Sequence, residues 1–305
     1  FEAMPLWGVP FAVKDNIDVA GTPTTAACPE FAYTAEEDAF VIKRLRAAGA
    51  LLIGKTNLDQ FATGLVGMRT PYPAPLNAID PEVVPGGSSS GSAVAVAQGL
   101  VSFSLGTDTA GSGRVPAALN GIVGLKPSRG ALSNRGVIPA CRTLDCVSIF
   151  ALTADDAFEI FKSVAVQDSS DAYSRAYPPF RRSGMLSHLR VGVPSAETIR
   201  FFGDEYQQRS FNQSIDTLRE VGAIVTEVDF DPFYAVADLL YKGPWVAERH
   251  TVIEALLAEK PDAVHPVTRQ VTKVALGFSA TDTFRAMYRL RELAQEITAA
   301  MASVD

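Results

Sequence analysis

The chain has 305 residues, of which 47% are hydrophobic and 20% are charged. A globular protein with a large core has this composition, and the length allows one large α/β domain or two smaller ones. The net charge of −7 and the sequence pI near 5.1 argue against a nucleic-acid partner, because surfaces that bind nucleic acids are basic. No apolar run has the length of a membrane span, so we expect no membrane partner.

Cysteine and histidine are scarce, with three residues of each in the chain. A small, odd number of cysteines argues against a disulfide framework and favours a reducing, cytoplasmic compartment. So few histidines leave little material for a histidine metal centre or a Ser-His-Asp triad, and we expect neither a metal nor a cofactor. The residues that follow Phe1 lack the pattern of a signal peptide and do not resemble a natural start.

Strand and helix patterns alternate along the chain, which predicts α/β construction. Short apolar runs predict strands at residues 9–13, 51–55, 101–105, 189–193 and 223–228, and we expect strand 51–55 to be buried. Apolar residues at helical spacing predict helices at residues 38–48, 92–100, 115–119, 154–164 and around 211–218, followed by a mostly helical region from 233 to 305. Residues 68–87 and 167–189 show little periodicity and are predicted loops.

A run of glycines and serines at residues 86–92, followed by a turn at 108–114, carries the strongest chemical signal. Such small residues leave backbone N–H groups unshielded and let hydroxyls approach one another, which suits a nucleophilic site that stabilises an anion. A Gly/Ser run is usually a linker, but this one passes directly into an alanine-rich helix. The run also lacks the Gly-Lys-Ser/Thr ending of a phosphate-binding loop.

Lys14 is the third component of this pattern. A lone lysine is usually a solvated surface charge, but Lys14 ends an apolar strand and is followed by Asp15 and Asn16, so we expect a buried, hydrogen-bonded amine. Burial lowers the pKa of a lysine, and a neutral amine can accept the proton of a serine hydroxyl. Lysine, hydroxyls and glycine-rich turns in this order are the parts of a Ser-Ser-Lys hydrolase.

Residues 7–148 resemble the amidase signature family. The stretches that carry the resemblance are residues 8–15, 54–57, 85–92 and 121–127. The resemblance implies one large α/β domain over residues 1–305, with a central mixed sheet flanked by helices. Within it we expect a catalytic core at 1–166 and a peripheral, substrate-gripping lobe at 167–305. Domains of this family extend further at both ends, so we expect the chain to begin inside the domain and to stop before its closing strands.

The resemblance also implies a Ser-cisSer-Lys triad. Ser112 corresponds to the nucleophile, Ser88 to the bridging serine and Lys14 to the base. The peptide bond between Gly87 and Ser88 is expected to be cis. In this arrangement Lys14 takes a proton from Ser88, which takes one from Ser112.

The turn around the nucleophile is expected to stabilise negative charge. By the same resemblance, the backbone N–H groups of Thr109, Ala110, Gly111 and Ser112 form the oxyanion hole. We expect the two charged residues of this turn, Asp108 and Arg114, to brace the loop rather than touch the substrate.

Within the family, three stretches resemble the allophanate hydrolase branch. They are residues 59–67, 110–116 and 241–249, of which 110–116 departs from the usual Gly-Gly-Ser-Ile turn. The branch implies that Tyr241 and Arg249 grip the carboxylate of a small anionic substrate, with Gly64 lining the pocket. Taken without the resemblance, the pattern favours a core position for Tyr241 and a surface position for Arg249.

The geometry of this pair depends on the intervening residues. Eight residues along a helix return to nearly the same face, so the phenol of Tyr241 and the guanidinium of Arg249 are able to converge. The Gly243-Pro244 break interrupts that helix and leaves the angle between the two side chains open.

The function that the resemblance implies is hydrolysis of the terminal amide of allophanate (urea-1-carboxylate), through an acyl-enzyme and with release of ammonia. The branch further implies urea catabolism alongside a biotin-dependent urea carboxylase, and it allows a homodimer. The alternatives are another amidase, acting on malonamate or aryl amides or serving as the glutaminase subunit of a tRNA amidotransferase, and an inactive scaffold or partner-binding lobe. The intact Lys14, Ser88 and Ser112 argue against the scaffold.

Overall fold

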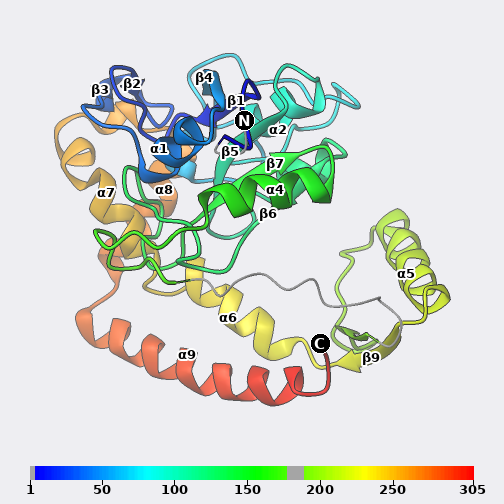
Figure 1. The fold of residues 1–305 in the computed structure, drawn as a ribbon. Coiled ribbons are helices and arrows are strands. Elements are labelled where there is room, and N and C mark those ends of the chain that lie inside the picture. The colour runs from blue at the N-terminus through cyan, green and yellow to red at the C-terminus, as the bar shows by residue number, and fades with distance from the viewer. Residues whose placement is uncertain (1–3, 177–188) are drawn as a thin grey trace. The chain divides into compact units, whose positions relative to one another are not determined.

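The computed structural model describes residues 4–176 and 189–305, and the chain divides into two compact units (Figure 1). The first unit comprises residues 1–178 and 247–274, and the second comprises 179–246 and 275–305. None of these unit boundaries coincides with the boundary that was expected at residue 166. The division into a catalytic core and a substrate-gripping lobe stays a prediction.

A five-stranded mixed sheet forms the centre of the first unit. Its strands, in spatial order, are β4 (Leu51–Thr56), β1 (Pro10–Lys14), β5 (Phe103–Asp108), β7 (Cys146–Ala151) and β6 (Val123–Leu125). β1 runs parallel to β4 and β5, whereas β7 runs antiparallel to β5 and β6. The α/β class and the mixed central sheet are therefore confirmed.

One expectation about this sheet is wrong. Residues 51–55 were expected to form a buried strand, but Leu51 is 55% exposed and Ile53 is 63% exposed. The reason is position, because β4 is an edge strand that pairs only with β1 within the sheet. Apolar composition alone does not separate an edge strand from a central one.

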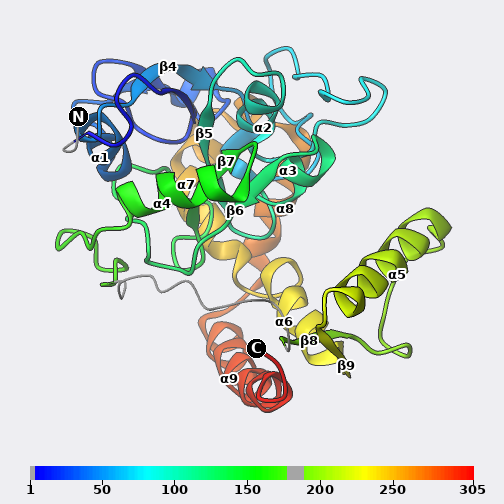
Figure 2. The same cartoon turned by 45° about the vertical axis from the view of Figure 1, so that its right-hand side comes forward.

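Four helices pack on the sheet (Figure 2). They are α1 (Phe40–Ala47), α2 (Ser90–Ala97), α3 (Val115–Leu119) and α4 (Ala154–Val164). Side chains alternate along a strand, so β1 sends Phe11 and Val13 into the large core beneath α1 and α4, and Ala12 into the smaller core beneath α2 and α3. On the second face the packing leaves no room for a side chain at Gly106, since a Cβ there would lie 2.6 Å from Phe150 Cε2 and 2.7 Å from Ser89 Oγ.

The helix starts follow local chemistry. Thr153 caps α4 by accepting a hydrogen bond from the amide of Asp156, and Pro116 lies in the first turn of α3. α2 begins at Ser90, two residues earlier than expected, and β5 continues to Asp108. Ser88 therefore lies just before a helix, and the 109–112 loop directly follows a strand.

The rest of the first unit is mostly helical. Its elements are β2 (Pro23–Thr24), β3 (Tyr33–Thr34), α7 (Val246–Glu259), α8 (Pro266–Lys273) and the short 3-10 helices Pro29–Phe31, Gln60–Ala62 and Pro261–Ala263. The 3-10 helix Val274–Gly277 begins with the last residue of this unit and continues into the second one. β2 and β3 form an antiparallel pair. In the described ranges, no helix combines the length and the apolar character that a membrane crossing requires.

In its described residues, the second unit contains a two-stranded parallel sheet and three α-helices. They are β8 (Arg190–Pro194), β9 (Ile224–Val228), α5 (Glu205–Glu220), α6 (Asp231–Tyr241) and α9 (Ala280–Met301). Within this unit α6 packs against α9. α9 starts with a capping box in which Ser279 and Asp282 exchange hydrogen bonds. Part of the predicted 167–189 loop, residues 177–188, lies outside the described residues, and 167–176 contains neither helix nor strand.

The chain between Tyr241 and Arg249 does not form one helix. α6 ends at Tyr241 and α7 begins at Val246, so the Gly243-Pro244 break separates two helices. Proline lacks the amide that an ongoing helix needs, which explains the break. The spacing argument for convergence of Tyr241 and Arg249 on one helix face is therefore wrong.

Candidate active site

Lys14 is the last residue of β1, and its side chain is completely buried. Its Nζ donates hydrogen bonds to Ser88 Oγ and to Thr107 Oγ1, each at 2.8 Å. The amide Nδ2 of Asn16 also donates to Thr107 Oγ1, at 3.2 Å. In the part of the chain that the structure describes, Lys14 forms no ion pair, so hydroxyl groups are the immediate neighbours of its amine.

The surroundings of Lys14 change its proton affinity. Burial lowers the pKa of Lys14 from 10.5 to about 7, because a low-dielectric interior disfavours the ammonium form. The carboxylates of Asp59, Asp108 and Asp145 act in the opposite direction, and the guanidinium of Arg249 adds to the lowering. A lysine with a pKa near 7 carries a free lone pair at neutral pH, so it can accept a proton from a hydroxyl.

Ser88 is buried and follows a cis peptide bond from Gly87, as the family resemblance implied. Its carbonyl accepts a hydrogen bond from the amide of Asp59 at 3.0 Å, and the amide of Gly87 donates to the carbonyl of Leu65 at 2.8 Å. A Cβ on Gly87 would lie 2.2 Å from Asp59 Oδ2, so the site requires glycine at this position. These contacts hold the Ser88 hydroxyl at the amine of Lys14.

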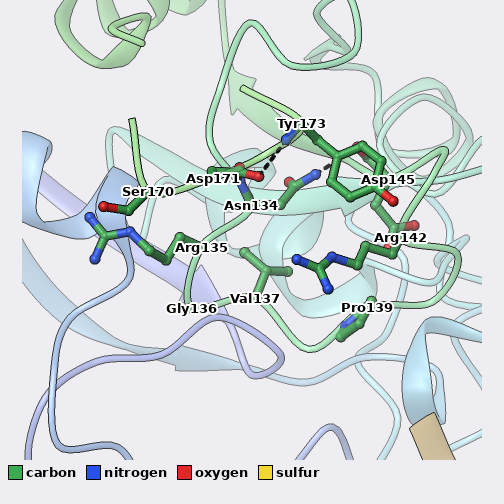
Figure 3. Close-up of a pocket in the computed structure, with 10 residues that line it drawn as sticks. All are labelled: Asn134, Arg135, Gly136, Val137, Pro139, Arg142, Asp145, Ser170, Asp171 and Tyr173. Atoms are coloured by element: carbon green, nitrogen blue, oxygen red, sulfur yellow. Dashed lines mark hydrogen bonds between the residues drawn. The ribbon is translucent and has the colours of Figure 1, made fainter. Parts of the chain in front are cut away.

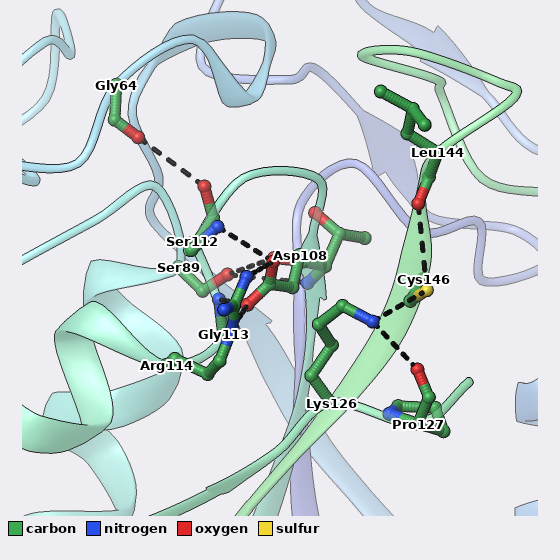
Figure 4. A network of polar contacts seen from close by, with 12 residues as sticks. Gly64, Ser89, Asp108, Ser112, Gly113, Arg114, Lys126, Pro127, Leu144 and Cys146 are labelled. Carbon is green, nitrogen blue, oxygen red and sulfur yellow. Dashed lines mark hydrogen bonds and ion pairs between the residues drawn. The ribbon is translucent and has the colours of Figure 1, made fainter. Parts of the chain in front are cut away.

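Ser112 lies in the loop between β5 and α3 and is 4% exposed. Its Oγ is 3.5 Å from the carbonyl oxygen of Gly64, which is a long contact (Figure 4). Gly64 also has to be glycine, because a Cβ there would lie 2.6 Å from Asp59 Oδ2. Within residues 4–176 and 189–305, no hydrogen bond joins Ser112 to Ser88. The structure thus connects Lys14 to Ser88 directly and places Gly64 beside Ser112.

A buried carboxylate braces the Ser112 loop. Asp108 accepts hydrogen bonds from the amides of Gly111 at 2.8 Å and Gly113 at 3.0 Å. The guanidinium of Arg114 contacts both carboxylate oxygens of Asp108, through Nε and Nη2 at 3.0 Å each (Figure 4). The expectation that Asp108 and Arg114 brace the loop is confirmed.

The same contacts restrict the expected oxyanion hole. Since the N–H of Gly111 donates to Asp108, this structure does not offer it to a substrate. For the amides of Thr109, Ala110 and Ser112, the described part of the chain supplies no acceptor. The donors that remain for an oxyanion are therefore three of the four amides that the resemblance implied.

Asp145 comes immediately before β7, and the sequence analysis did not identify it as a residue of this site. Its carboxylate accepts hydrogen bonds from the hydroxyl of Thr109 and from the amide of Ala140 at 2.8 Å. Burial raises the pKa of Asp145. The sequence did contain one cue, which is an acidic residue directly before a run of apolar and small residues. The structure adds that this run pairs with β5 and that Cys146 lies opposite Asp108.

The two residues expected to grip the substrate fall in different units. Arg249, on α7 in the first unit, is 3% exposed, so the alternative surface position is wrong. Its Nη1 donates to Thr63 Oγ1 at 3.1 Å and to the carbonyl of Ala62 at 3.3 Å. Tyr241 belongs to the second unit and is 40% exposed, which does not fit a core position. The joint action of Tyr241 and Arg249 stays a prediction.

Metal-ligating groups are dispersed in the described ranges. No set of three or more His, Cys, Asp and Glu side chains among those residues is arranged to hold a metal ion. The three cysteines, Cys28, Cys141 and Cys146, are buried and form no disulfide. The chemistry of this region is therefore that of hydroxyls, one amine and backbone amides.

Comparison with known proteins agrees with this geometry. The family model for Amidase matches residues 1–305. Urea amidolyase of Saccharomyces cerevisiae is 47% identical over 307 residues, which cover all of this chain and 17% of that protein. A glutamyl-tRNA(Gln) amidotransferase subunit of Symbiobacterium thermophilum is 42% identical over 248 residues, covering 77% of this chain and 51% of that protein.

Solved structures give the same result. The urea amidolyase of K. lactis matches with a TM-score of 0.94 and 44% identity, over 100% of this chain and 18% of that one. The allophanate hydrolase of Kluyveromyces lactis matches with the same TM-score and identity, over 100% of this chain and 50% of that one. The chain thus spans less than a fifth of the urea amidolyases and half of the allophanate hydrolase. On the match over its whole length, the chain belongs to the amidase family.

Proposed function

We propose that this chain hydrolyses the terminal amide of allophanate, with Ser112 as nucleophile, Ser88 as proton bridge and Lys14 as base. The observation that carries the proposal is the 2.8 Å contact between the buried amine of Lys14 and the hydroxyl of Ser88. A lysine whose pKa is about 7 is suited to accept protons at neutral pH. Support for the substrate comes from relatives named urea amidolyase and allophanate hydrolase, at 44–47% identity.

The reaction proceeds in two stages. Ser112 Oγ attacks the terminal amide carbon while its proton passes through Ser88 to the lone pair of Lys14. The tetrahedral intermediate collapses, the C–N bond breaks, and the ammonium of Lys14 returns the proton through Ser88 to the departing ammonia. A water molecule then attacks the acyl-enzyme along the same proton route, which releases the dicarboxylated amine and restores Ser112.

The loop that carries Ser112 stabilises the developing oxyanion in this scheme. The amides of Thr109, Ala110 and Ser112 are the available donors, because Gly111 already donates to Asp108. Donors held in place before the reaction lower the barrier, since they need no reorganisation when charge develops. The brace formed by Asp108 and Arg114 provides that rigidity.

Recognition of the substrate carboxylate is assigned to Arg249. A buried guanidinium favours an anionic substrate, because its planar donors pair with both oxygens of a carboxylate. Gly64, whose carbonyl lies beside Ser112, lines the pocket. The role of Tyr241 as a second contact rests on the sequence resemblance to the allophanate hydrolase branch.

The decisive experiment measures ammonia release from allophanate, malonamate and glutamine by the wild-type chain and by Ser112→Ala. We expect turnover of allophanate to exceed that of the other two amides, and Ser112→Ala to abolish it. A preference for malonamate or glutamine would assign the chain to another amidase class, the latter being favoured by the amidotransferase relatives at 39–42% identity. Failure of a serine-reactive phosphonate to label Ser112 would support an inactive scaffold.

The setting of the reaction is also part of the proposal. The urea amidolyase relatives support a link to urea carboxylation, which supplies a carboxylated urea as substrate. The cytoplasmic location and the homodimer stay predictions from the sequence. Size-exclusion chromatography with light scattering tests the dimer.

A further inference from the structure

Asp145 hydrogen-bonds to two separate loops through one buried carboxylate. It accepts from the hydroxyl of Thr109, in the loop that carries the nucleophile. It also accepts from the amides of Ala140 at 2.8 Å and Cys141 at 3.1 Å. Its own backbone carbonyl accepts from Asn134 Nδ2 at 2.8 Å, which fixes the residue itself. The carboxylate thus ties residues 109–112 to residues 140–145.

The 140–145 segment is held at its other side by α7, within the same unit. The amide and the hydroxyl of Thr143 donate to Glu248 Oε2, at 3.3 and 2.9 Å. The next residue on that helix is Arg249, whose guanidinium reaches Thr63 Oγ1 at 3.1 Å. A continuous path of hydrogen bonds and short backbone segments therefore joins the start of α7 to the Ser112 loop through Asp145.

We propose that Asp145 is a positioning residue that orients the oxyanion donors of the Ser112 loop and couples them to the helix carrying Arg249. The inference rests on the proposed function, because it takes this loop as the oxyanion hole. Fixing the Thr109 side chain restricts the backbone of Thr109, and with it the direction of its amide and that of Ala110. Asp145 acts through these groups and touches no reacting atom.

The negative charge of Asp145 affects the pKa of Lys14, and the pH profile of kcat/KM reports that effect. The groups that act on the amine of Lys14 are the carboxylates of Asp59, Asp108 and Asp145, which raise its pKa, and the guanidinium of Arg249, which lowers it. Asp145→Asn removes one of the raising charges, so the pKa of Lys14 falls further. The acidic limb of the pH profile of kcat/KM should move to lower pH. Loss of packing alone would not move that limb in this direction.

A cavity beside Asp145 offers a second test (Figure 3). Asp145 lines a cavity of about 300 Å³ together with Asn134, Arg135, Arg142 and Tyr173. The guanidinium of Arg142 lies 5.4 Å from the ring centre of Tyr173 and has no ion pair among the described residues. The positive charge of Arg142 attracts small anions. Asp145→Ala should leave a space that formate can enter from the cavity. The formate carboxylate would then accept the hydrogen bond from the Thr109 hydroxyl in place of Asp145.

The experiment compares Asp145→Asn, Thr109→Val, their double variant and the matched control Thr109→Ser, on the full chain with allophanate. We expect each of the first two to lower kcat by about 10- to 100-fold with KM within about twofold. This loss is smaller than the roughly 10²- to 10³-fold cost of removing an oxyanion donor, because the donors are misdirected and not removed. The double variant should be no worse than the single variants, because both act on the same contact, between the Thr109 hydroxyl and the side chain of residue 145. Thr109→Ser keeps the hydroxyl that donates to Asp145, so it should retain more activity than Thr109→Val. Formate should raise the activity of Asp145→Ala and leave that of Thr109→Val unchanged.

Three outcomes would overturn the inference: an unchanged kcat in Asp145→Asn, losses that multiply in the double variant, or no response of Asp145→Ala to formate. The rate at which a fluorophosphonate labels Ser112 is measured in parallel, because it depends on the loop and not on allophanate. If the wild type labels but does not turn over allophanate, the proposed substrate is wrong. The same variant comparison, read from labelling rates, then still decides the role of Asp145.

Discussion

The amine of Lys14 lies 2.8 Å from the hydroxyl of Ser88, and both side chains are fully buried. Lysine is rarely buried without a paired charge, and here hydroxyl oxygens surround its amine. This placement stabilises the neutral form of the amine. It gives the chain a base that works near pH 7.

The pH dependence of activity should follow Lys14. With a pKa of about 7, the amine is protonated below that pH and can no longer accept a proton. We expect kcat/KM for allophanate to fall about tenfold per pH unit below pH 7 and to level off above it. A pH series from 5 to 9 measures this. A kcat/KM that still rises about tenfold per unit up to pH 9 would mean that the amine is not held in the neutral form.

Lys14 should also reduce the stability of the fold. Its pKa is about 7 in the folded chain and 10.5 as a free side chain, so between these values the unfolded state binds more protons. The free energy of unfolding therefore rises with pH across this window, and the penalty is complete below pH 7. Lys14→Met should be inactive, yet it should melt at a higher temperature than wild type at pH 7. The difference should shrink toward pH 10, and equal melting temperatures at pH 7 would contradict the argument.

Ser88→Ala tests the proton bridge against a neighbour in the same run. Removing the Ser88 hydroxyl leaves Lys14 without a route to Ser112, so kcat should fall by about 10²- to 10⁴-fold. Ser90 is the matched control, because its Oγ is buried and makes no hydrogen bond to any described residue. Ser90→Ala should retain wild-type kcat. Equal losses in both variants would indicate a packing defect rather than a broken proton route.

Gly87→Ala tests the close approach of the Ser88 loop to Asp59. The added methyl would lie 2.2 Å from Asp59 Oδ2, so the loop or the carboxylate has to move. We expect loss of activity together with a melting temperature several degrees lower, since overpacking costs about 1–3 kcal/mol. Gly54→Ala is the control, because a Cβ there meets nothing within 4 Å. A fully active Gly87→Ala would show that this loop is not tightly constrained.

Arg249→Gln tests the recognition of the substrate carboxylate. Loss of a charge-assisted contact of about 1.5–3 kcal/mol should lower kcat/KM for allophanate roughly 10- to 100-fold. Biuret, a neutral analogue in which an amide replaces the carboxylate, is the control substrate, and its kcat/KM should change much less. Equal losses on both substrates would show that Arg249 supports the fold through Thr63 rather than binding an anion.

Much of the candidate site could be predicted because it is encoded locally. The strand that ends at Lys14, the glycine before Ser88 and the turn around Asp108 each carry their signal within a few residues. Local patterning also identified most helices, and the cap at Thr153 fixed the start of one of them.

The contacts that were missed join segments far apart in the chain. Asp145 meets Thr109 across 36 residues, and Thr143 meets Glu248 across 105 residues. The exposure of Leu51 depends on which strand forms the edge of the sheet, and hydropathy does not encode that order. Long-range pairing therefore limits what the sequence alone reveals here.

The two faces of the central sheet differ in how much change they can tolerate. Beneath α2 the packing leaves so little room that a methyl group added at Gly106 would meet the side chains of Phe150 and Ser89. Beneath α1 and α4 the core consists of large aliphatic and aromatic side chains, away from the hydroxyls. Attempts to make the protein more heat-resistant should therefore be directed at the α1–α4 side, where volume-conserving swaps leave the chemistry untouched.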